Sequence, residues 1–342
     1  MMYWVLSAAM GIFLVWFLWE KKHRKTRAMP GGIHKDICLP HEQEFELYHN
    51  ALSLCSKKVR VCLDELGISY KGHHIHLVET GHYETLSRHF LKVNPAAILP
   101  VLIHNGHPVY ESHDILTYAA NHSNNPKLLV PEDPKAQEAM QYWVDKASII
   151  GEDAKEGIKV SAGYCAATLS LPLFAAGMTF IPLRYPLVGL LFHRLKIRAL
   201  LFSLLKISGL PGFIKLTPLL KMMASGRDHM HKHLAELEQQ LNTNSPWIMG
   251  DQFTLADVSW MTIFERLRES DWLDYYIKDK HYPNLEEYWQ RLQARDSYKT
   301  AILDHGHHSI DKSLQLIKDT KMVNPKIKET LEQCFAEPTK IQ

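Results

Sequence analysis

Charged side chains are missing from two long stretches of this 342-residue chain, although the chain as a whole is nearly neutral, with a formal net charge of +2. From Met1 to Trp19 there is no charged residue. From Gly157 to Arg227 there is no acidic residue, whereas lysines and arginines recur throughout. A solvated surface normally mixes both signs of charge. The two stretches therefore indicate contact with something other than water, and a membrane is the first candidate.

Cysteine is also scarce, and its five copies are odd in number and widely spaced: Cys38, Cys55, Cys62, Cys165 and Cys334. This pattern argues against a disulfide framework and against a zinc cluster, and it favours a reducing compartment. The sequence has no glycine-rich phosphate loop, and no nucleic-acid motif accompanies its basic residues. We therefore expect no nucleic-acid partner.

The uncharged N-terminal stretch has the properties of a membrane anchor. As a helix, residues 1–19 rise about 28 Å, close to the hydrocarbon thickness of a bilayer. Aromatic residues lie near both ends, and the basic run begins only at Lys21. A cleaved signal peptide normally starts with basic residues. We expect an uncleaved single-pass anchor at 1–19, a basic juxtamembrane linker at 20–44, and, by the positive-inside rule, a cytoplasmic catalytic domain.

The acid-free segment is predicted to be an insertion at 158–225 that faces the membrane. Its apolar runs, such as Leu169–Leu183, are interrupted by prolines and flanked by basic residues. A full crossing by Cys165–Leu183 would place the two halves of the fold on opposite sides of the bilayer. An interfacial or re-entrant arrangement keeps them together, and the alternative is an apolar lid packed on a substrate pocket.

The first chemical motif runs from Phe45 to Gly67. Phe45–His49 has the pattern of a short buried strand, and apolar residues recur at helical spacing from Ser53 onward. Such a turn aims backbone amides and the helix dipole at an anion, for which a thiolate qualifies. Ser53 either donates its hydroxyl to that sulfur or only caps the helix. Cys55 is a second candidate thiol, or an ordinary residue at the helix start.

The second motif is Leu99-Pro100, ahead of the strand Val101–Ile103. Proline at this place indicates either the first residue of a strand or a cis peptide bond. After a hairpin turn at Asn105-Gly106, Glu111-Ser112 opens the next helix, where amides and a hydroxyl suit a carboxylate and Glu111 suits an ammonium group. A ligand with a zwitterionic end, a peptide bond and a thiol fits these features, and glutathione has all three.

With these motifs in order, residues 45–122 resemble the thioredoxin-like N-terminal domain of glutathione transferases. The resemblance implies that Ser53 stands where theta- and zeta-like members keep a catalytic serine, and Ser53–Arg60 is most similar to the zeta-like pattern. It also implies that glutathione binds at Leu99, Pro100, Glu111 and Ser112, with Leu99 pairing to the peptide through its backbone.

The C-terminal half resembles the same family through Pro246–Ser259, in which Thr254 and Asp257 form a structural helix cap. The expected fold is an α/β thioredoxin-like domain at 45–122 and an all-α glutathione-transferase domain at 134–320. One transmembrane helix precedes them, and 321–342 is a tail. Tyr142 and Trp143 either line the substrate pocket or belong to the interdomain core.

The function expected from this resemblance is a membrane-anchored glutathione transferase. Glutathione is its co-substrate, and a hydrophobic or membrane-derived electrophile and membrane lipids are its other partners, with a homodimer as one possible assembly. The alternative is a catalytically weak membrane scaffold or sensor, similar to the ganglioside-induced differentiation-associated branch, whose members typically carry a C-terminal anchor. His229 and His233 stand at i and i+4, but no third ligand is evident, so no metal is expected.

Overall fold

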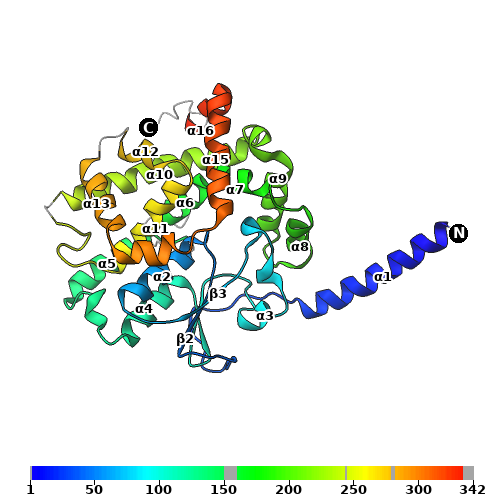
Figure 1. The fold of residues 1–342 in the computed structure, drawn as a ribbon, viewed down its shortest axis with the longest axis horizontal. Helices are drawn as coiled ribbons and strands as arrows, with labels where there is room; N and C mark the ends of the chain where they lie inside the picture. The colour runs from blue at the N-terminus through cyan, green and yellow to red at the C-terminus, as the bar shows by residue number, and fades with distance from the viewer. Residues whose placement is uncertain (1, 150–159, 243–244, 279–281, 334–342) are drawn as a thin grey trace.

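The computed structural model describes residues 2–149, 160–242, 245–278 and 282–333 (Figure 1). Its sheet has the strand order β1-β5-β4-β2-β3. The strands are β1 (Gly32–Ile33), β2 (Phe45–His49), β3 (Lys71–His74), β4 (Val101–His104) and β5 (His107–Tyr110). β2 is parallel to β3 and antiparallel to β4, and β4 is antiparallel to β5. The predicted thioredoxin-like arrangement is confirmed.

Short helices accompany this sheet: α2 (Leu54–Glu65), α3 (Phe90–Val93) and α4 (Ser112–His122), with the 3-10 turns η1 (Val78–Thr80), η2 (Glu84–Leu86) and η3 (Pro126–Leu128). α2 is followed by Gly67 at φ +66°, a conformation that glycine adopts without a steric penalty. α2 packs against α4 and against α11 of the helical domain. Its N-terminus is thereby held at the boundary between the two domains.

The second domain is helical. Its elements are α5 (Pro134–Lys146), α6 (Ala162–Leu169), α7 (Leu171–Met178), α8 (Arg184–Phe192), α9 (Lys196–Phe213), α10 (Thr217–Leu241), α11 (Leu255–Glu269), α12 (Leu273–Ile277), α13 (Pro283–Gln293), α14 (Asp296–Tyr298), the π-helical turn η5 (Lys299–Leu303), α15 (His308–Val323) and α16 (Pro325–Gln333). One hydrophobic core extends through both domains. α11 lies inside it, with Trp260 and Phe264 fully buried.

The start of α11 contains the capping box expected at Thr254 and Asp257. Asp257 Oδ2 accepts from the Thr254 amide at 2.9 Å, and Asp257 Oδ1 accepts from the Ile248 amide at 3.0 Å. The Tyr288 hydroxyl also donates to Asp257, at 2.9 Å. A fully buried carboxylate is tolerated here because several donors satisfy it.

The N-terminal helix α1 (Met2–His23) extends beyond the predicted 1–19 and projects away from the body (Figure 1). Within the described residues, it is the single helix that by itself is long and apolar enough to cross a membrane, with a mean hydropathy of 1.5 over its best window. α9 and α10 reach the same threshold only as a pair bent by 78°. N-terminal signal sequences and anchors share the properties of α1.

The segment predicted to be a linker is held against the sheet. Gly32 pairs with Tyr110 and Ile33 with Val109, which makes β1 an additional edge strand. The Leu39 amide also donates to the Gly106 carbonyl at 2.8 Å. The expectation of a linker over 20–44 is therefore wrong for this part. The physical reason is that the edge of β5 offers unpaired backbone groups, which pattern reasoning did not assign to a partner.

The acid-free segment is divided between core and surface. α6 packs on α10, and α7 packs on α9 and α15. Cys165, Leu169 and Met178 are fully buried. The predicted membrane-facing insertion of 158–225 is thus wrong for α6 and α7, whose small and apolar side chains are covered by other helices; residues 158–159 lie outside the described residues. Exposed apolar side chains occur instead on α8 and α9.

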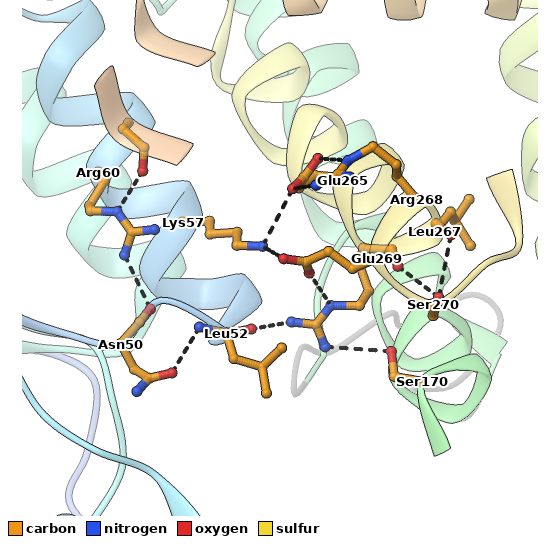
Figure 2. Close-up of polar contacts among 12 residues, drawn as sticks. Asn50, Leu52, Lys57, Arg60, Ser170, Glu265, Leu267, Arg268, Glu269 and Ser270 are labelled. Carbon is orange, nitrogen blue, oxygen red and sulfur yellow. Dashed lines mark hydrogen bonds and ion pairs between the residues drawn. The ribbon is translucent and has the colours of Figure 1, made fainter. Parts of the chain in front are cut away.

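A buried ionic network joins α2 to α11 (Figure 2). Lys57 Nζ forms an ion pair with Glu269 and lies 3.9 Å from Glu265 Oε1. Arg266 Nε donates to Glu269 Oε2 at 3.1 Å, and another nitrogen of the same guanidinium donates to the Leu52 carbonyl. Burial lowers the pKa of Lys57, and the two glutamates oppose that effect. The network connects the start of α2 to the helical domain.

Removing Glu269 is expected to destabilise the protein strongly. Glu269→Ala leaves the Lys57 ammonium buried without its main partner, and breaking such a pair typically costs about 3–5 kcal/mol. Urea denaturation measures the loss. As a matched control, Asp274→Ala removes the partner of Lys278 in an exposed pair, and we expect a cost below about 1 kcal/mol. Similar losses in the two variants would contradict the role given to the network.

Candidate functional site

Ser53 is the N-cap of α2. Its hydroxyl oxygen accepts from the Ser56 amide at 3.2 Å, and its backbone is extended. The two predicted roles of Ser53 are chemically compatible, because a hydroxyl that accepts through a lone pair still has its hydrogen to donate. Ser53 and Cys55 are both partly exposed, so each is accessible to a ligand at the helix start.

The Leu99-Pro100 peptide bond is cis. Pro100 is buried, whereas Leu99 is partly exposed and packs at the margin of a cluster that contains Tyr48 and Val101. Within the described part of the chain, the Leu99 backbone N–H has no protein hydrogen-bond partner. Such a free amide suits the main-chain pairing predicted for a peptide ligand.

Glu111 and Ser112 lie at the start of α4. Glu111 has φ 63° and ψ 127°, an uncommon conformation for a residue other than glycine. Strained backbone of this kind is often kept where it orients functional groups. Burial and the neighbouring Asp114 raise the pKa of Glu111, and Arg194 opposes them. Glu111 thus presents a partly buried carboxyl whose ionised form an ammonium group would stabilise.

The juxtamembrane segment approaches these two residues closely. A Cβ atom added to Gly31 would lie 1.9 Å from Asp114 Oδ2 and 3.2 Å from Glu111 Cβ. Met29 packs at the margin of the same hydrophobic cluster as Leu99. The chain that leaves α1 therefore passes directly beside the residues predicted to bind the zwitterionic end of glutathione.

Lys58, His113 and Asp145 are further residues at this place, and sequence reasoning missed them. Lys58 Nζ donates to the Ala147 carbonyl at 2.6 Å and lies 3.1 Å from His113 Nε2. His113 Nδ1 in turn lies 3.9 Å from Asp145 Oδ1. His113 follows Ser112 directly, so these contacts connect the start of α4 to a residue one turn into α2.

The environment of Lys58 disfavours the protonated, charged form of its side chain. Burial lowers the pKa of Lys58 to about 8, and Cys55 and Asp145 oppose the shift. Burial, with the help of Lys58, also lowers the pKa of His113. A signal for Lys58 was available in the sequence, since it stands at i+3 from Cys55 and therefore on the same helix face. Its burial was not, because that depends on α5.

Tyr142 and Trp143 lie in different environments. Trp143 is buried against Trp260, with ring centroids 5.7 Å apart, and its carbonyl accepts from Trp260 Nε1 at 3.0 Å. Tyr142 is 37% exposed, and its hydroxyl donates to Glu236 at 2.6 Å. Trp143 thus lies in the core, whereas contact with a substrate stays a prediction for Tyr142.

A cavity of about 410 Å³ lies between α2, α11 and the segment that leads into α15. It reaches Ala51, near Ser53, and its walls mix charged and apolar side chains: Lys57, Glu265, Arg268, Glu269 and Asp311 with Ile302, Leu303 and Ile310. Its size suits a small molecule. Sequence reasoning did not find this cavity, because its walls come from segments far apart in the chain.

Each of the two histidines considered for a metal has a hydrogen-bond partner within the protein. His233 is buried and bonds the Val160 carbonyl, whereas the ring of His229 bonds the Ser225 carbonyl one turn earlier on α10. In the described ranges, no group of three or more His, Cys, Asp or Glu residues has the geometry to hold a metal ion.

Lys58 gives the site a pH dependence that can be measured. The pKa of Lys58 is about 8 in the folded state and about 10.4 in the unfolded state. Between these two pH values the unfolded state therefore binds up to one proton more than the folded state. The unfolding free energy of the wild type should therefore rise relative to Lys58→Met from pH 8 to 10, by at most about 1.4 kcal/mol per pH unit.

Urea titrations at fixed pH values check this expectation. Lys92→Met, at an exposed lysine, should follow the wild type throughout the same range. If the Lys58→Met profile is parallel to the wild type, Lys58 does not titrate as described.

Comparisons with known proteins follow the same two halves of the chain. Residues 47–127 match the model of the glutathione S-transferase N-terminal domain, and residues 221–300 match the model of the C-terminal domain. Among curated proteins, the chain is 26% identical to glutathione S-transferase TCHQD of Arabidopsis thaliana, over 75% of this chain and 89% of that protein. It is 23% identical to a tetrachloro-p-hydroquinone reductive dehalogenase of Sphingobium chlorophenolicum, over 75% and 95%.

Solved structures agree on the fold. The beta-etherase LigF of Sphingobium sp. strain SYK-6 superposes with a TM-score of 0.61 at 20% identity, over 77% of this chain and 100% of that one. A delta-class glutathione transferase of Nilaparvata lugens superposes with a TM-score of 0.53 at 17% identity, over 80% and 99%. The prediction of a glutathione transferase is confirmed at the level of the family, and the chain belongs to the glutathione S-transferase superfamily.

Proposed function

We propose that this protein is a membrane-anchored glutathione transferase that joins glutathione to a hydrophobic electrophile. The observation that carries the proposal is the 3.1 Å contact between Lys58 and His113. It joins Lys58, one turn into α2 after Ser53 and Cys55, to His113, which follows Glu111 and Ser112 at the start of α4, and so supports one shared site. Two helix N-termini then face one ligand, which favours a molecule with both a thiolate and a carboxylate.

In this proposal, each part of glutathione is bound by a different residue. Ser112 and the first amides of α4 receive the carboxylate, Glu111 pairs with the ammonium group, and the Leu99 backbone pairs with the peptide. Ser53 donates its hydroxyl hydrogen to the sulfur, because a hydrogen bond to an anion stabilises its charged form. Cys55 and the buried Lys58 ammonium adjoin the same helix start.

The reaction is a nucleophilic substitution. The glutathione thiol loses its proton to solvent, and the thiolate attacks the electrophilic carbon. A carbon–sulfur bond forms while the bond to the leaving group breaks, and the leaving group departs with the electron pair. Ser53 acts by lowering the pKa of the thiol, so that more thiolate is present near neutral pH.

The electrophile is proposed to be lipophilic and to come from the bilayer. α1 is proposed to anchor the chain with its folded domains in the cytoplasm, since the basic residues follow the apolar helix. The Sphingobium relative is named for a chlorinated hydroquinone. A halogenated aromatic compound is therefore a suitable first electrophile for an assay.

Ser53→Ala is expected to raise the pKa of bound glutathione by about 1–2 units and to lower kcat/KM at neutral pH by at least about tenfold. Glutathione affinity should change little, since the other contacts remain. Spectroscopic titration of the thiolate gives the pKa, and calorimetry gives the affinity.

Two further variants separate the possible roles of Ser53. Asp133→Ala removes the N-cap of α5 and should cost stability of about 1 kcal/mol without a change in the thiol pKa. In Cys55→Ser, the pKa of bound glutathione should stay as low as in the wild type, because Ser53 is still present. If Ser53→Ala and Asp133→Ala behave alike, Ser53 is only a cap; if the wild type binds no glutathione, the transferase proposal fails.

A further inference from the structure

The base of α1 is clamped to the folded body. Glu20 is only 4% exposed, and its carboxylate pairs with Arg24 and with Arg88, each at 2.5 Å. The Arg88 guanidinium stacks over the Trp19 ring at 3.7 Å. Because a buried carboxylate with two arginine partners has little freedom to move, the direction of α1 is set by the domain that follows it.

The same end of α1 contacts α8. Trp16 and Phe17 pack on Phe192, with ring centroids 6.3 and 6.0 Å apart, and the Arg24 guanidinium lies 5.4 Å from the same ring. The Arg194 amide donates to Thr26 Oγ1 at 2.9 Å. α8 and α9 therefore lie on the side of the body from which α1 projects, as Figure 1 shows.

α8 and α9 each present an apolar stripe to the outside. On α9, Ile197, Leu200, Leu204 and Ile207 follow the spacing of one helix face, and Ile197 and Ile207 are 74% and 76% exposed. Ahead of and along α8, Leu183, Leu187 and Leu191 repeat every fourth residue and are 40–43% exposed. Exposed stripes of this size mark interaction surfaces.

The charge around these stripes has one sign. Arg184, Arg194 and Lys196 are exposed beside them, and no acidic residue occurs between Gly157 and Arg227. Burial and Lys21 of α1 lower the pKa of Lys196. Lys21 and Lys196 are both exposed, so basic residues occur on the anchor as well as on α9. Arg198 differs, since it pairs with Glu79 at 2.8 Å and serves the fold.

We propose that α8 and α9 form a docking face that lies on the anionic leaflet of the membrane in which α1 is anchored. This inference rests on the anchoring part of the proposed function. The clamp at Glu20 orients α1, and a bilayer around α1 then meets α8 and α9 first. Their leucines and isoleucines enter the interface while the arginines and lysines meet anionic headgroups. The Arg194 amide bonds Thr26, and Gly31 approaches Glu111, so the chain after α1 runs from this face to a residue proposed to bind glutathione.

The test uses the full chain, reconstituted into vesicles of phosphatidylcholine with phosphatidylserine. An environment-sensitive fluorescent amino acid is introduced at position 207 by codon suppression, and lipids that carry a nitroxide quench it when it is immersed. A matched control position is Val323 on α15, which is 81% exposed. We expect quenching of at least about twofold at 207 and none at 323.

Charge variants test the headgroup contact. Replacing Arg184, Arg194 and Lys196 together by Gln should reduce the quenching at 207 by about half or more, since each basic residue contributes to binding. Lys326→Gln with Lys328→Gln, at exposed lysines of α16, should leave it unchanged. Equal quenching in vesicles of phosphatidylcholine alone would overturn the role of anionic headgroups.

The outcomes separate this inference from the proposed function. A chain that fails to stay with the vesicles after alkaline washing refutes the anchor. A chain that stays anchored but shows no quenching at 207 refutes the docking face alone. If the fluorophore at position 207 reports an apolar environment without lipid, and does so in a way that depends on protein concentration, the face binds a second copy of the chain. That result would also overturn the proposal. Glutathione transfer is assayed separately.

Discussion

The buried ionic contact between α2 and α11 is the interaction on which the site depends. Lys57 reaches from the first turn of α2 to Glu269, and Arg266 beside it bonds the Leu52 carbonyl, one residue before Ser53. The loop that carries the candidate nucleophile-activating group is thus held by charges from the other domain. Because buried charges cannot lose their partners without a large cost, the position of Ser53 is coupled to the packing of the whole helical domain.

The same boundary explains why the candidate site combines residues with two roles. Ser53 accepts a hydrogen bond as a helix cap and still has a hydrogen for a sulfur ligand. Lys58 is buried, and its ammonium contacts His113 at the start of α4 and the Ala147 carbonyl at the end of α5. Substitutions near the start of α2 are therefore expected to affect both the stability of the fold and the chemistry of the site. Matched control variants are needed to tell the two effects apart.

The two halves of the acid-free stretch between Gly157 and Arg227 serve different purposes. α6 and α7 supply small and apolar side chains to the core of the helical domain, whereas α8 and α9 keep an apolar and basic surface outward. α1 contacts α8 through Trp16, Phe17 and Phe192, so the exposed helices and the N-terminal helix form one continuous surface. The juxtamembrane chain then runs beside Glu111, which links that surface to a residue predicted to bind glutathione.

The sequence alone determined the strands at Phe45–His49 and Val101–Ile103, the second of which ends at His104 in the structure. It also determined the cap at Ser53, the proline after Leu99 and the capping box at Asp257, because each depends on neighbouring residues and local backbone preference. Only the tertiary structure decided the pairing of Gly32 with Tyr110, the burial of α6 and α7 and of Trp143, and the contact of Lys58 with His113. These features join segments far apart in the chain. Composition shows that a helix is apolar, but the choice between core and surface depends on which other helix arrives to cover it.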